Sequence, residues 1–462
     1  MSFWVKNKSF FFIAVSLFLY ISFGYFLERT NFSLVISLWT GLFGCFYFLL
    51  KDKKIQIQTY IGLAILFRII FLFATPNLSQ DFYRLIWDGR LILEGLNPYL
   101  SLPKTFIQQQ EFPIDRALEL YQGMGKMNGS NYTNYPPLNQ LCFFIAALIS
   151  SKNIFGAIMV LRCIIILADI GILYFGSKLL TKLNLPIKRI FWFVLNPFVI
   201  IELTGNLHFE SVMLFFLIWG LYQLQKSKWI FGALLIALSI SVKLIPLLFI
   251  PLFLQYFTKQ KKVDFSKESF SKNLVRYGIF VLIVLGTTIG LFLPFYASTL
   301  IDNYSNSVGL WFKNFEFNAS FYYIFRAIGY WFRGYNEIAV IGKILPVITA
   351  LFLLILTFFR DNTSIKKLID TLLFGICFYY FFSTTVHPWY IATPLLLCVF
   401  TQYHFPIVWS FFIILSYQAY SNLPWQENLW FVGVAYVFVF FTLIIELKLK
   451  KLSTLAKKTF TP

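Results

Sequence analysis

Charged residues are scarce in this sequence. Asp, Glu, Lys and Arg together make up only 13% of the 462 residues, whereas 58% are hydrophobic and Phe alone accounts for 58 positions. Soluble domains usually carry about 25% charged residues, which cover their exterior. So little ionic surface excludes a soluble enzyme, a disordered protein and a secreted disulfide scaffold, and we expect an integral membrane protein.

Residues that bind metals or form disulfides are also few, with 3 His and 5 Cys. All five cysteines lie within apolar runs and lack metal-ligand spacing, a pattern typical of small buried hydrophobic residues. We therefore predict no metal site. The GxSxG, P-loop, GxGxxG and HExxH motifs are absent from the sequence as well, so the enzyme classes that they mark have no support.

Long apolar runs are what the sequence does contain. A membrane-spanning helix needs about 20 apolar residues. About fourteen runs approach that length, so the sequence predicts an all-α, polytopic transmembrane protein. The runs lie at 9–26, 33–50, 58–75, 154–177, 187–203, 209–225, 229–242, 245–257, 277–297, 338–359, 366–384, 389–402, 405–420 and 429–447.

The formal net charge is +19, and the positions of the basic residues predict the membrane topology of the chain. Cytoplasmic loops of membrane proteins collect Lys and Arg, which explains the excess better than nucleic-acid binding does. All basic clusters fall on one side if both termini are cytoplasmic and the apolar run 137–150 does not cross. We therefore predict that 137–150 is a re-entrant or interfacial helix. The clusters lie at 51–54, 178–189, 226–228, 259–276, 366–367 and 448–458.

The same topology places two long loops outside the cytoplasm, at 76–136 and 298–337. The first has helical periodicity, and we expect short amphipathic helices on the outer membrane surface there. We divide the chain into three parts. An additional N-terminal transmembrane hairpin (1–57) precedes a transmembrane module (58–297), which contains the first loop, and a C-terminal module (298–462), which contains the second.

Polar residues gather at the start of the first outer loop. Asp81 follows the third apolar run by a few residues, where a carboxylate at the boundary between lipid and water suits a base acting on a membrane-bound substrate. Asp88 would share a helix face with it. A structural interpretation stays open beside this one, in which Asp81 caps a surface helix and Asp88 pairs with Arg84.

Ionisable residues also gather around the outer end of the run 187–203, namely Glu202, His208 and Glu210. Ionisable groups at membrane depth are costly and therefore suggest function. Their position at the end of the run weakens that argument, so both interpretations stand. Within the earlier run 154–177, Arg162 and Asp169 share a helix face, and we expect them to form a structural pair or to line a polar cavity.

Three further positions allow both a structural and a functional interpretation. Tyr135 precedes two prolines at the start of run 137–150, which suits a helix start or a substrate contact. Lys243 joins two short apolar runs and suits either an anionic head group or ordinary lipid phosphate. His387, in the sequence His-Pro-Trp-Tyr ending at Tyr390, suits phosphate binding or proton transfer, although Trp and Tyr also fit an interfacial belt.

These residues, in this order, resemble the GT-C superfamily of membrane glycosyltransferases. Those enzymes transfer a sugar from a polyprenyl-phosphate carrier on the extracytoplasmic face, and the nearest resemblance is to mannosyltransferases that include the first GPI mannosyltransferase. The similarity covers roughly residues 58–400. It rests on Asp81, the DG…GLNPY element with Asn97 and Tyr99, Tyr-Pro-Pro-Leu at 135–138, Asn196-Pro197, the Glu/His cluster, Lys243, Asn318-Ala319-Ser320 and His-Pro-Trp-Tyr at 387–390.

The resemblance implies an inverting transfer in which Asp81 is the general base. It implies that Lys243, His387 and Arg84 bind the donor phosphate. Position 83 is Tyr, so the DxD pattern of some relatives is missing. We assign no cofactor, and a divalent metal stays open as an alternative that no DxD motif supports. The resemblance also suggests a set of substrate-lining residues: Asp88, Asn97, Tyr99, Tyr135, Glu202, His208, Glu210 and Tyr390.

We therefore expect a hexosyltransferase in a bacterial inner or plasma membrane. Its donor would be a polyprenyl-phosphate sugar, with mannose expected and glucose or an aminopentose as alternatives, and its acceptor a lipid-linked or cell-envelope glycan. Its other partners would be membrane lipids, not nucleic acid. The alternative from another class is a flippase for lipid-linked oligosaccharides or a secondary transporter. Transporters often have inverted repeats and polar groups at the midplane, and the sequence has neither in evidence.

Overall fold

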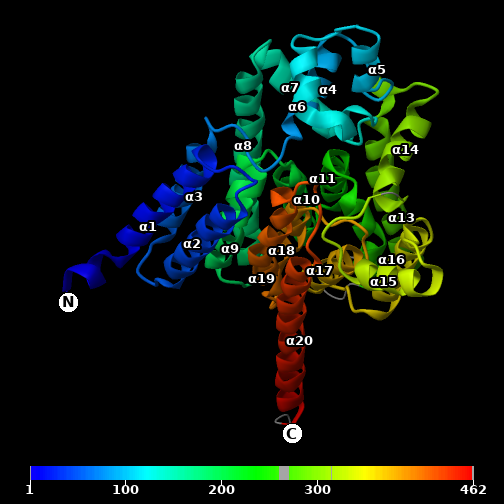
Figure 1. The fold of residues 1–462 in the computed structure, drawn as a ribbon. Coiled ribbons are helices and arrows are strands. Elements are labelled where there is room, and N and C mark those ends of the chain that lie inside the picture. The colour runs from blue at the N-terminus through cyan, green and yellow to red at the C-terminus, as the bar shows by residue number, and fades with distance from the viewer. Residues whose placement is uncertain (1, 260–269, 314, 460–462) are drawn as a thin grey trace.

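The computed structural model describes residues 2–259, 270–313 and 315–459. These residues form helices joined by loops, and their one β-type pairing is an isolated bridge between Phe317 and Thr385. Figure 1 shows the helices gathered into one body from which the C-terminal helix projects. An all-helical chain agrees with the apolar composition, because a helix satisfies its own backbone hydrogen bonds in lipid.

The N-terminal hairpin consists of α1 (Ser2–Tyr25) and α2 (Phe32–Lys51), and α3 (Ile57–Phe71) follows it. Asn31 starts α2, because its side chain accepts a hydrogen bond from the backbone N–H of Leu34. The buried Trp39 indole donates to the carbonyl of Phe411, 372 residues away. The hairpin therefore packs against the C-terminal part of the chain.

The first large loop folds into short helices, as its periodicity predicted. They are α4 (Phe82–Leu93), α5 (Pro103–Gln108) and α6 (Ala117–Gly129), and α7 (Pro137–Ser150) follows them. Figure 1 shows α4 to α7 together at one end of the molecule, with both termini toward the other end. Nine of the 12 residues of α4 are buried beneath its neighbours, and the expected place of these helices on the outer membrane surface stays a prediction.

The Asp88-Gly89 element owes its glycine to helix packing. At Gly89, α4 crosses α7 so closely that a Cβ atom would lie 2.2 Å from the carbonyl oxygen of Phe143. Only glycine leaves room for that approach. Gly95 then ends the helix with a positive φ of 75°.

The remaining helices follow in chain order. They are α8 (Ile154–Lys182), η1 (Ile187–Ile190), α9 (Phe191–Val194), η2 (Val199–Gly205), α10 (Glu210–Gln225), α11 (Trp229–Val242), η3 (Ile245–Phe253), α12 (Leu254–Thr258), α13 (Phe270–Gly290), η5 (Leu293–Phe295), α14 (Leu300–Lys313), α15 (Phe321–Arg333), α16 (Ile338–Phe359), α17 (Ile365–Phe381), η6 (Pro388–Ile391), α18 (Ala392–Cys398), α19 (Phe405–Phe412), η7 (Ile413–Ser421) and α20 (Leu429–Thr459).

The count of about fourteen spans is not confirmed. In the described part of the chain six helices are long and apolar enough to cross a membrane, or seven if the pair Val199–Gly205 and Glu210–Gln225, bent by 110°, is one span. The other predicted spans are helices of 17 residues or fewer, and several are interrupted by proline, which breaks the helical hydrogen-bond ladder. The six are Lys8–Tyr25, Phe32–Lys51, Ile154–Lys182, Phe270–Phe295, Ile338–Phe359 and Leu429–Leu452.

Part of the largest predicted basic cluster, residues 260–269, lies outside the described residues. The helix predicted over 137–150 forms with those bounds as α7, which is too short to count among the candidate spans. It packs against α4 and α8, and its relation to a membrane stays a prediction.

The expected pair between Arg162 and Asp169 is wrong. Asp169 instead accepts a 2.7 Å hydrogen bond from Nε of the buried Arg68 on α3. Arg162 turns to the backbone and donates to the carbonyls of Thr204 and Gly205, at 2.9 and 2.8 Å. Those carbonyls end the π-helix η2, where a cation compensates the negative end of a helix.

Candidate active site

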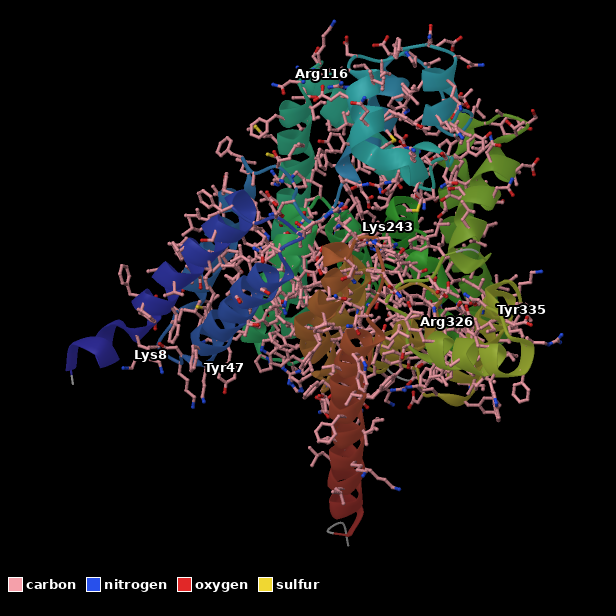
Figure 2. The ribbon with its side chains drawn as sticks, viewed as in Figure 1. Lys8, Tyr47, Arg116, Lys243, Arg326 and Tyr335 are labelled. Atoms are coloured by element: carbon pink, nitrogen blue, oxygen red, sulfur yellow. The ribbon has the colours of Figure 1, made fainter. Side chains whose placement is uncertain are left out.

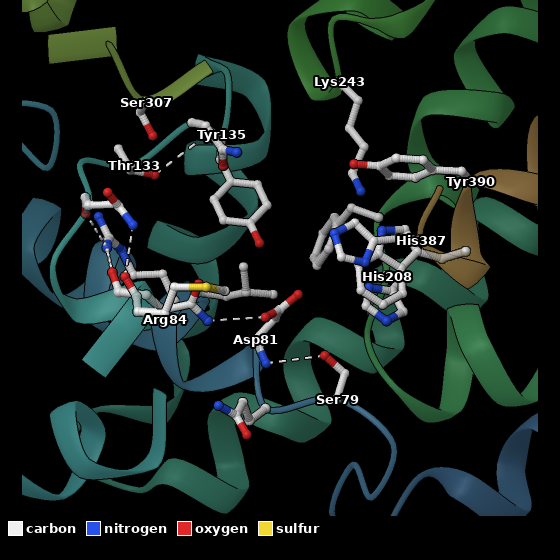
Figure 3. Close-up of a pocket in the computed structure, with 18 of the residues that line it drawn as sticks. Ser79, Asp81, Arg84, Thr133, Tyr135, His208, Lys243, Ser307, His387 and Tyr390 are labelled. Atoms are coloured by element: carbon white, nitrogen blue, oxygen red, sulfur yellow. Dashed lines mark hydrogen bonds between the residues drawn. The ribbon is translucent and has the colours of Figure 1, made fainter. Parts of the chain in front are cut away.

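A cavity of about 670 Å³ lies where several connections of the chain meet. Its lining residues come from the connections of α1 to α2, α3 to α4, α6 to α7, η2 to α10, α11 to η3, α14 to α15, α17 to η6 and η7 to α20, and α14 contributes a further wall. Of the residues proposed from the sequence, the cavity wall includes seven: Asp81, Arg84, Tyr135, His208, Lys243, His387 and Tyr390. Figure 3 shows Asp81 and Tyr135 on one side of it and Lys243, His208, His387 and Tyr390 on the other.

Asp81 faces the cavity because its backbone, and not its side chain, starts α4. Its carbonyl oxygen accepts from the N–H groups of Arg84 and Leu85, whereas its carboxylate makes no capping bond. The carboxylate accepts instead from the Asn128 amide at 3.2 Å. The interpretation of Asp81 as a helix cap is therefore wrong for the side chain.

One amide fixes the segment that carries Asp81. Oδ1 of the buried Asn206, which follows η2, accepts from three consecutive backbone N–H groups, those of Asn77, Leu78 and Ser79, at 3.1, 2.8 and 3.4 Å. Its Nδ2 donates to the carbonyl of Ile201 at 2.9 Å, which sets the direction of the amide. The main chain before Asp81 is thus attached to the end of the π-helix.

The surroundings of Asp81 act on its charge in opposite directions. Burial raises the pKa of the Asp81 carboxyl above its usual value, because a low-dielectric environment disfavours the carboxylate. The Asn128 hydrogen bond and the positive charges of Lys243 and Arg29 oppose this shift. Those partners therefore favour the ionised carboxylate, which is the form that a general base requires.

Lys243 stands across the cavity from Asp81 and is held by a buried acid. It directly follows α11 in an extended conformation, and its ammonium group pairs with the carboxylate of Glu210, the first residue of α10. Glu210 is fully buried, whereas the Lys243 side chain is 16% exposed. Figure 2 shows Lys243 in the middle of the molecule, so its charge is inside the fold.

Three rings are stacked beside Lys243. The Trp389 indole lies between the imidazoles of His208 and His387, with ring centroids 3.7 and 4.6 Å apart. Burial, and then the positive charge of Lys243, lower the pKa of His387 to about 3. His387 is therefore neutral at ordinary pH, and it offers a hydrogen bond rather than a positive charge to a ligand.

The Arg84 guanidinium is bound by other groups of the protein. It pairs with Asp88, as the structural interpretation of the sequence held. Its Nε donates to the Asp88 carboxylate at 2.8 Å, and its Nη1 donates to the carbonyls of Asn128 and Asn131. Gln140 binds the second oxygen of Asp88. Arg84 thus fixes the segment that brings Asn128 to Asp81, and Figure 3 shows it on the far side of Asp81 from Lys243.

Five residues predicted to line the substrate site do not line the cavity. Asp88 and Glu210 are buried behind the wall as partners of its cations, and Glu202 lies 3.9 Å behind His208. The amide of Asn97 donates to the carbonyl of Phe295, and the Tyr99 hydroxyl donates to that of Tyr135. None of these five side chains is part of the cavity wall, and four of them, all but Asn97, contact a residue that is.

Sequence reasoning missed Arg29, Asn128 and Tyr420, all of which line the cavity. Arg29 had a readable signal, because it lies at the predicted outer end of the first apolar run, where the usual bias disfavours a cation. Asn128 and Tyr420 are ordinary polar and aromatic residues, and only the fold brings them to Asp81. Among the described residues, no three His, Cys, Asp or Glu side chains are grouped to hold a metal ion.

A family model described as the N-terminal domain of alpha-(1->6)-mannopyranosyltransferase matches residues 22–259, more than half of the 462 residues. The chain belongs to this family. The match includes Asp81, Lys243 and the missed Arg29. It ends before His387, so the C-terminal wall of the cavity lies outside it.

Two curated relatives of this mannopyranosyltransferase-family chain are both named Alpha-(1->6)-mannopyranosyltransferase A. The protein of Mycobacterium tuberculosis is 25% identical over 174 residues, and that of Corynebacterium glutamicum is 24% identical over 176 residues. Each match covers 37% of this chain, and 32% and 33% of the two relatives. The chain therefore spans about a third of the length of the relatives that it matches.

Replacing Asn206 with Leu should destabilise the protein, because three backbone N–H groups lose their acceptor at once. An unsatisfied buried donor costs about 1–3 kcal/mol, so we expect a clear drop in the midpoint of thermal unfolding in detergent. Gln108→Leu is the matched control, because Gln108 is an exposed amide on α5. Equal midpoints for the two variants would contradict the anchoring role of Asn206.

Proposed function

We propose that this chain is a membrane mannosyltransferase that moves mannose from a polyprenyl-phosphate donor to a lipid-linked or cell-envelope glycan. The observation that carries the proposal is one cavity with a carboxylate, Asp81, on one wall and a cation with neutral hydrogen-bond donors on the other. Membership of the alpha-(1->6)-mannopyranosyltransferase family supports the sugar. The apolar helices support a membrane location.

In the proposed reaction an acceptor hydroxyl binds beside Asp81, which accepts its proton as the oxygen attacks the anomeric carbon. The bond from that carbon to the phosphate oxygen breaks, and the electron pair leaves with the lipid phosphate. Attack from the side opposite the phosphate inverts the configuration. Lys243 and His387, facing Asp81 across the cavity, would stabilise the charge that grows on the phosphate.

The cavity opens among the connections of the chain near α4 and α6, which supports a site on the extracytoplasmic face. In Figure 2, Arg116 lies at the end of the molecule formed by α4 to α7, whereas Lys8 lies toward the other end. Basic clusters favour the cytoplasmic side. We therefore propose cytoplasmic termini and an active site on the opposite face.

Replacing Asp81 with Asn should abolish transfer while the protein stays folded. The amide keeps the shape of the carboxyl but does not accept the proton, and general-base catalysis contributes about 10²–10⁴-fold. Purified protein with polyprenyl-phosphate mannose and a candidate acceptor would measure this effect. Asp115→Asn is the control, because Asp115 is an acid in the same loop that does not line the cavity.

Transfer by Asp81→Asn at a rate near that of the unmodified protein would remove Asp81 from the role of base. Movement of the sugar across a membrane without bond formation would instead support the transporter alternative.

Replacing Asn128 with Ala should move the acid limb of the pH–rate profile to higher pH. The Asn128 hydrogen bond stabilises the carboxylate, so its loss raises the pKa of Asp81 further, and a base works only above its pKa. Asn134→Ala, which changes another amide on the cavity wall, should leave the limb in place. The interpretation fails if both variants give the same profile as the unmodified protein.

Single cysteines in a cysteine-free background test the sidedness. A membrane-impermeant maleimide should label Gln109→Cys in intact cells, because residue 109 is exposed in the outer loop. It should label Lys54→Cys, in the basic cluster after α2, only after permeabilisation. The reverse pattern would overturn the proposed orientation.

A further inference from the structure

The cavity wall carries three Lys or Arg side chains, and two of them are already paired. Lys243 pairs with Glu210, and Arg84 pairs with Asp88. Arg29 is the third, and it has no carboxylate partner among residues 2–259, 270–313 and 315–459. The wall therefore carries one cation, Arg29, that forms no direct ion pair within the described part of the chain.

Arg29 is held by neutral groups that leave much of its guanidinium free. Nη1 donates to the carbonyl of Leu78 at 3.2 Å, and Nη2 donates to the side-chain oxygen of Gln80 at 3.0 Å. The guanidinium also lies over the Tyr420 ring, 4.8 Å from its centroid. Two of its five N–H groups are used in these bonds, and stacking on a ring favours one orientation of the planar group.

The position of Arg29 relates it directly to the proposed base. Leu78 and Gln80 belong to the short segment that ends at Asp81, so Arg29 lies beside the carboxylate that faces Lys243. The charge of Arg29 also reaches that carboxylate and opposes the rise in its pKa. A fixed, partly exposed guanidinium with free donors, in a cavity among apolar helices, has the chemistry of a site for a phosphate group.

We propose that Arg29 binds the phosphate of a lipid-linked substrate and so forms a second anion site, next to Asp81 rather than beside Lys243. This inference rests on the proposed function for the identity of its ligand as a lipid phosphate. Two sources share that chemistry, namely the phosphate of the donor and a phosphate that links the acceptor to its lipid. The first two helices then supply a substrate-binding residue.

Direct binding tests the proposal without turnover. Fluorescence of tryptophans, two of which line the cavity (Trp389 and Trp425), would report the binding of polyprenyl phosphate and of the neutral polyprenol of equal length. Arg29→Gln should weaken phosphate binding at least tenfold and leave polyprenol binding unchanged, and Arg29→Lys should recover part of the loss. Arg116→Gln, an exposed arginine on the outer loop, should match the unmodified protein.

Unchanged affinity of Arg29→Gln for polyprenyl phosphate would overturn the proposal. A fall in kcat without any change in that affinity would overturn it too, and would make Arg29 a positioning residue for Asp81. Equal losses for the phosphate and the alcohol would show a general defect in the cavity and would also overturn it.

Kinetics then distinguish the two sources. With a neutral oligomannoside acceptor, a raised KM for the polyprenyl-phosphate donor in Arg29→Gln identifies the donor phosphate. A raised KM for a phosphate-linked acceptor alone identifies the acceptor. The binding result also separates this inference from the proposed reaction, because Arg29→Gln can lose phosphate affinity even if Asp81→Asn retains transfer.

Discussion

The arrangement of the cavity depends on the side-chain amide of Asn206, which holds the irregular backbone segment before Asp81. Its oxygen accepts hydrogen bonds from three successive backbone N–H groups of that segment. In a regular helix or strand, backbone carbonyls would accept these bonds. The amide itself ends a π-helix whose last carbonyls bind Arg162. π-helical turns are found frequently at functional sites, and here the irregular turn connects a buried arginine to the backbone that carries the candidate base.

Two of the cations on the cavity wall, Lys243 and Arg84, are paired with buried acids. An ion removed from water needs a partner, and breaking a buried pair is strongly destabilising. Lys243 and Arg84 satisfy that rule with fully buried acids, Glu210 and Asp88. Asp88 and Glu210, which the sequence suggested as substrate contacts, lie behind the wall as partners of these cations, and Asp81 is the carboxylate among the described residues that line the cavity.

Apolar runs and helical periodicity predicted an all-helical membrane fold and helices in the first long loop. The order of motifs pointed to Asp81, Lys243 and His387, which line one cavity. The count of about fourteen spans stays unconfirmed, because several of the apolar runs form short helices or helices interrupted by proline, and run length alone does not separate these from spans. Arg162 was assigned to the wrong partner because helical spacing shows only which residues share a face. Asn128 and Tyr420 were unpredictable, since contacts between residues 47 or more positions apart depend on tertiary packing.

The near balance of charge in the cavity has a consequence for turnover. With two cations paired to buried acids, the groups left facing the ligand are one arginine and one aspartate of opposite sign. A strongly positive cleft would retain the spent lipid phosphate after transfer, because that product carries more negative charge than the donor from which it came. In the proposed reaction, pairing Lys243 and Arg84 with buried acids would therefore weaken the retention of that product, and it would also weaken the capture of a phosphate substrate.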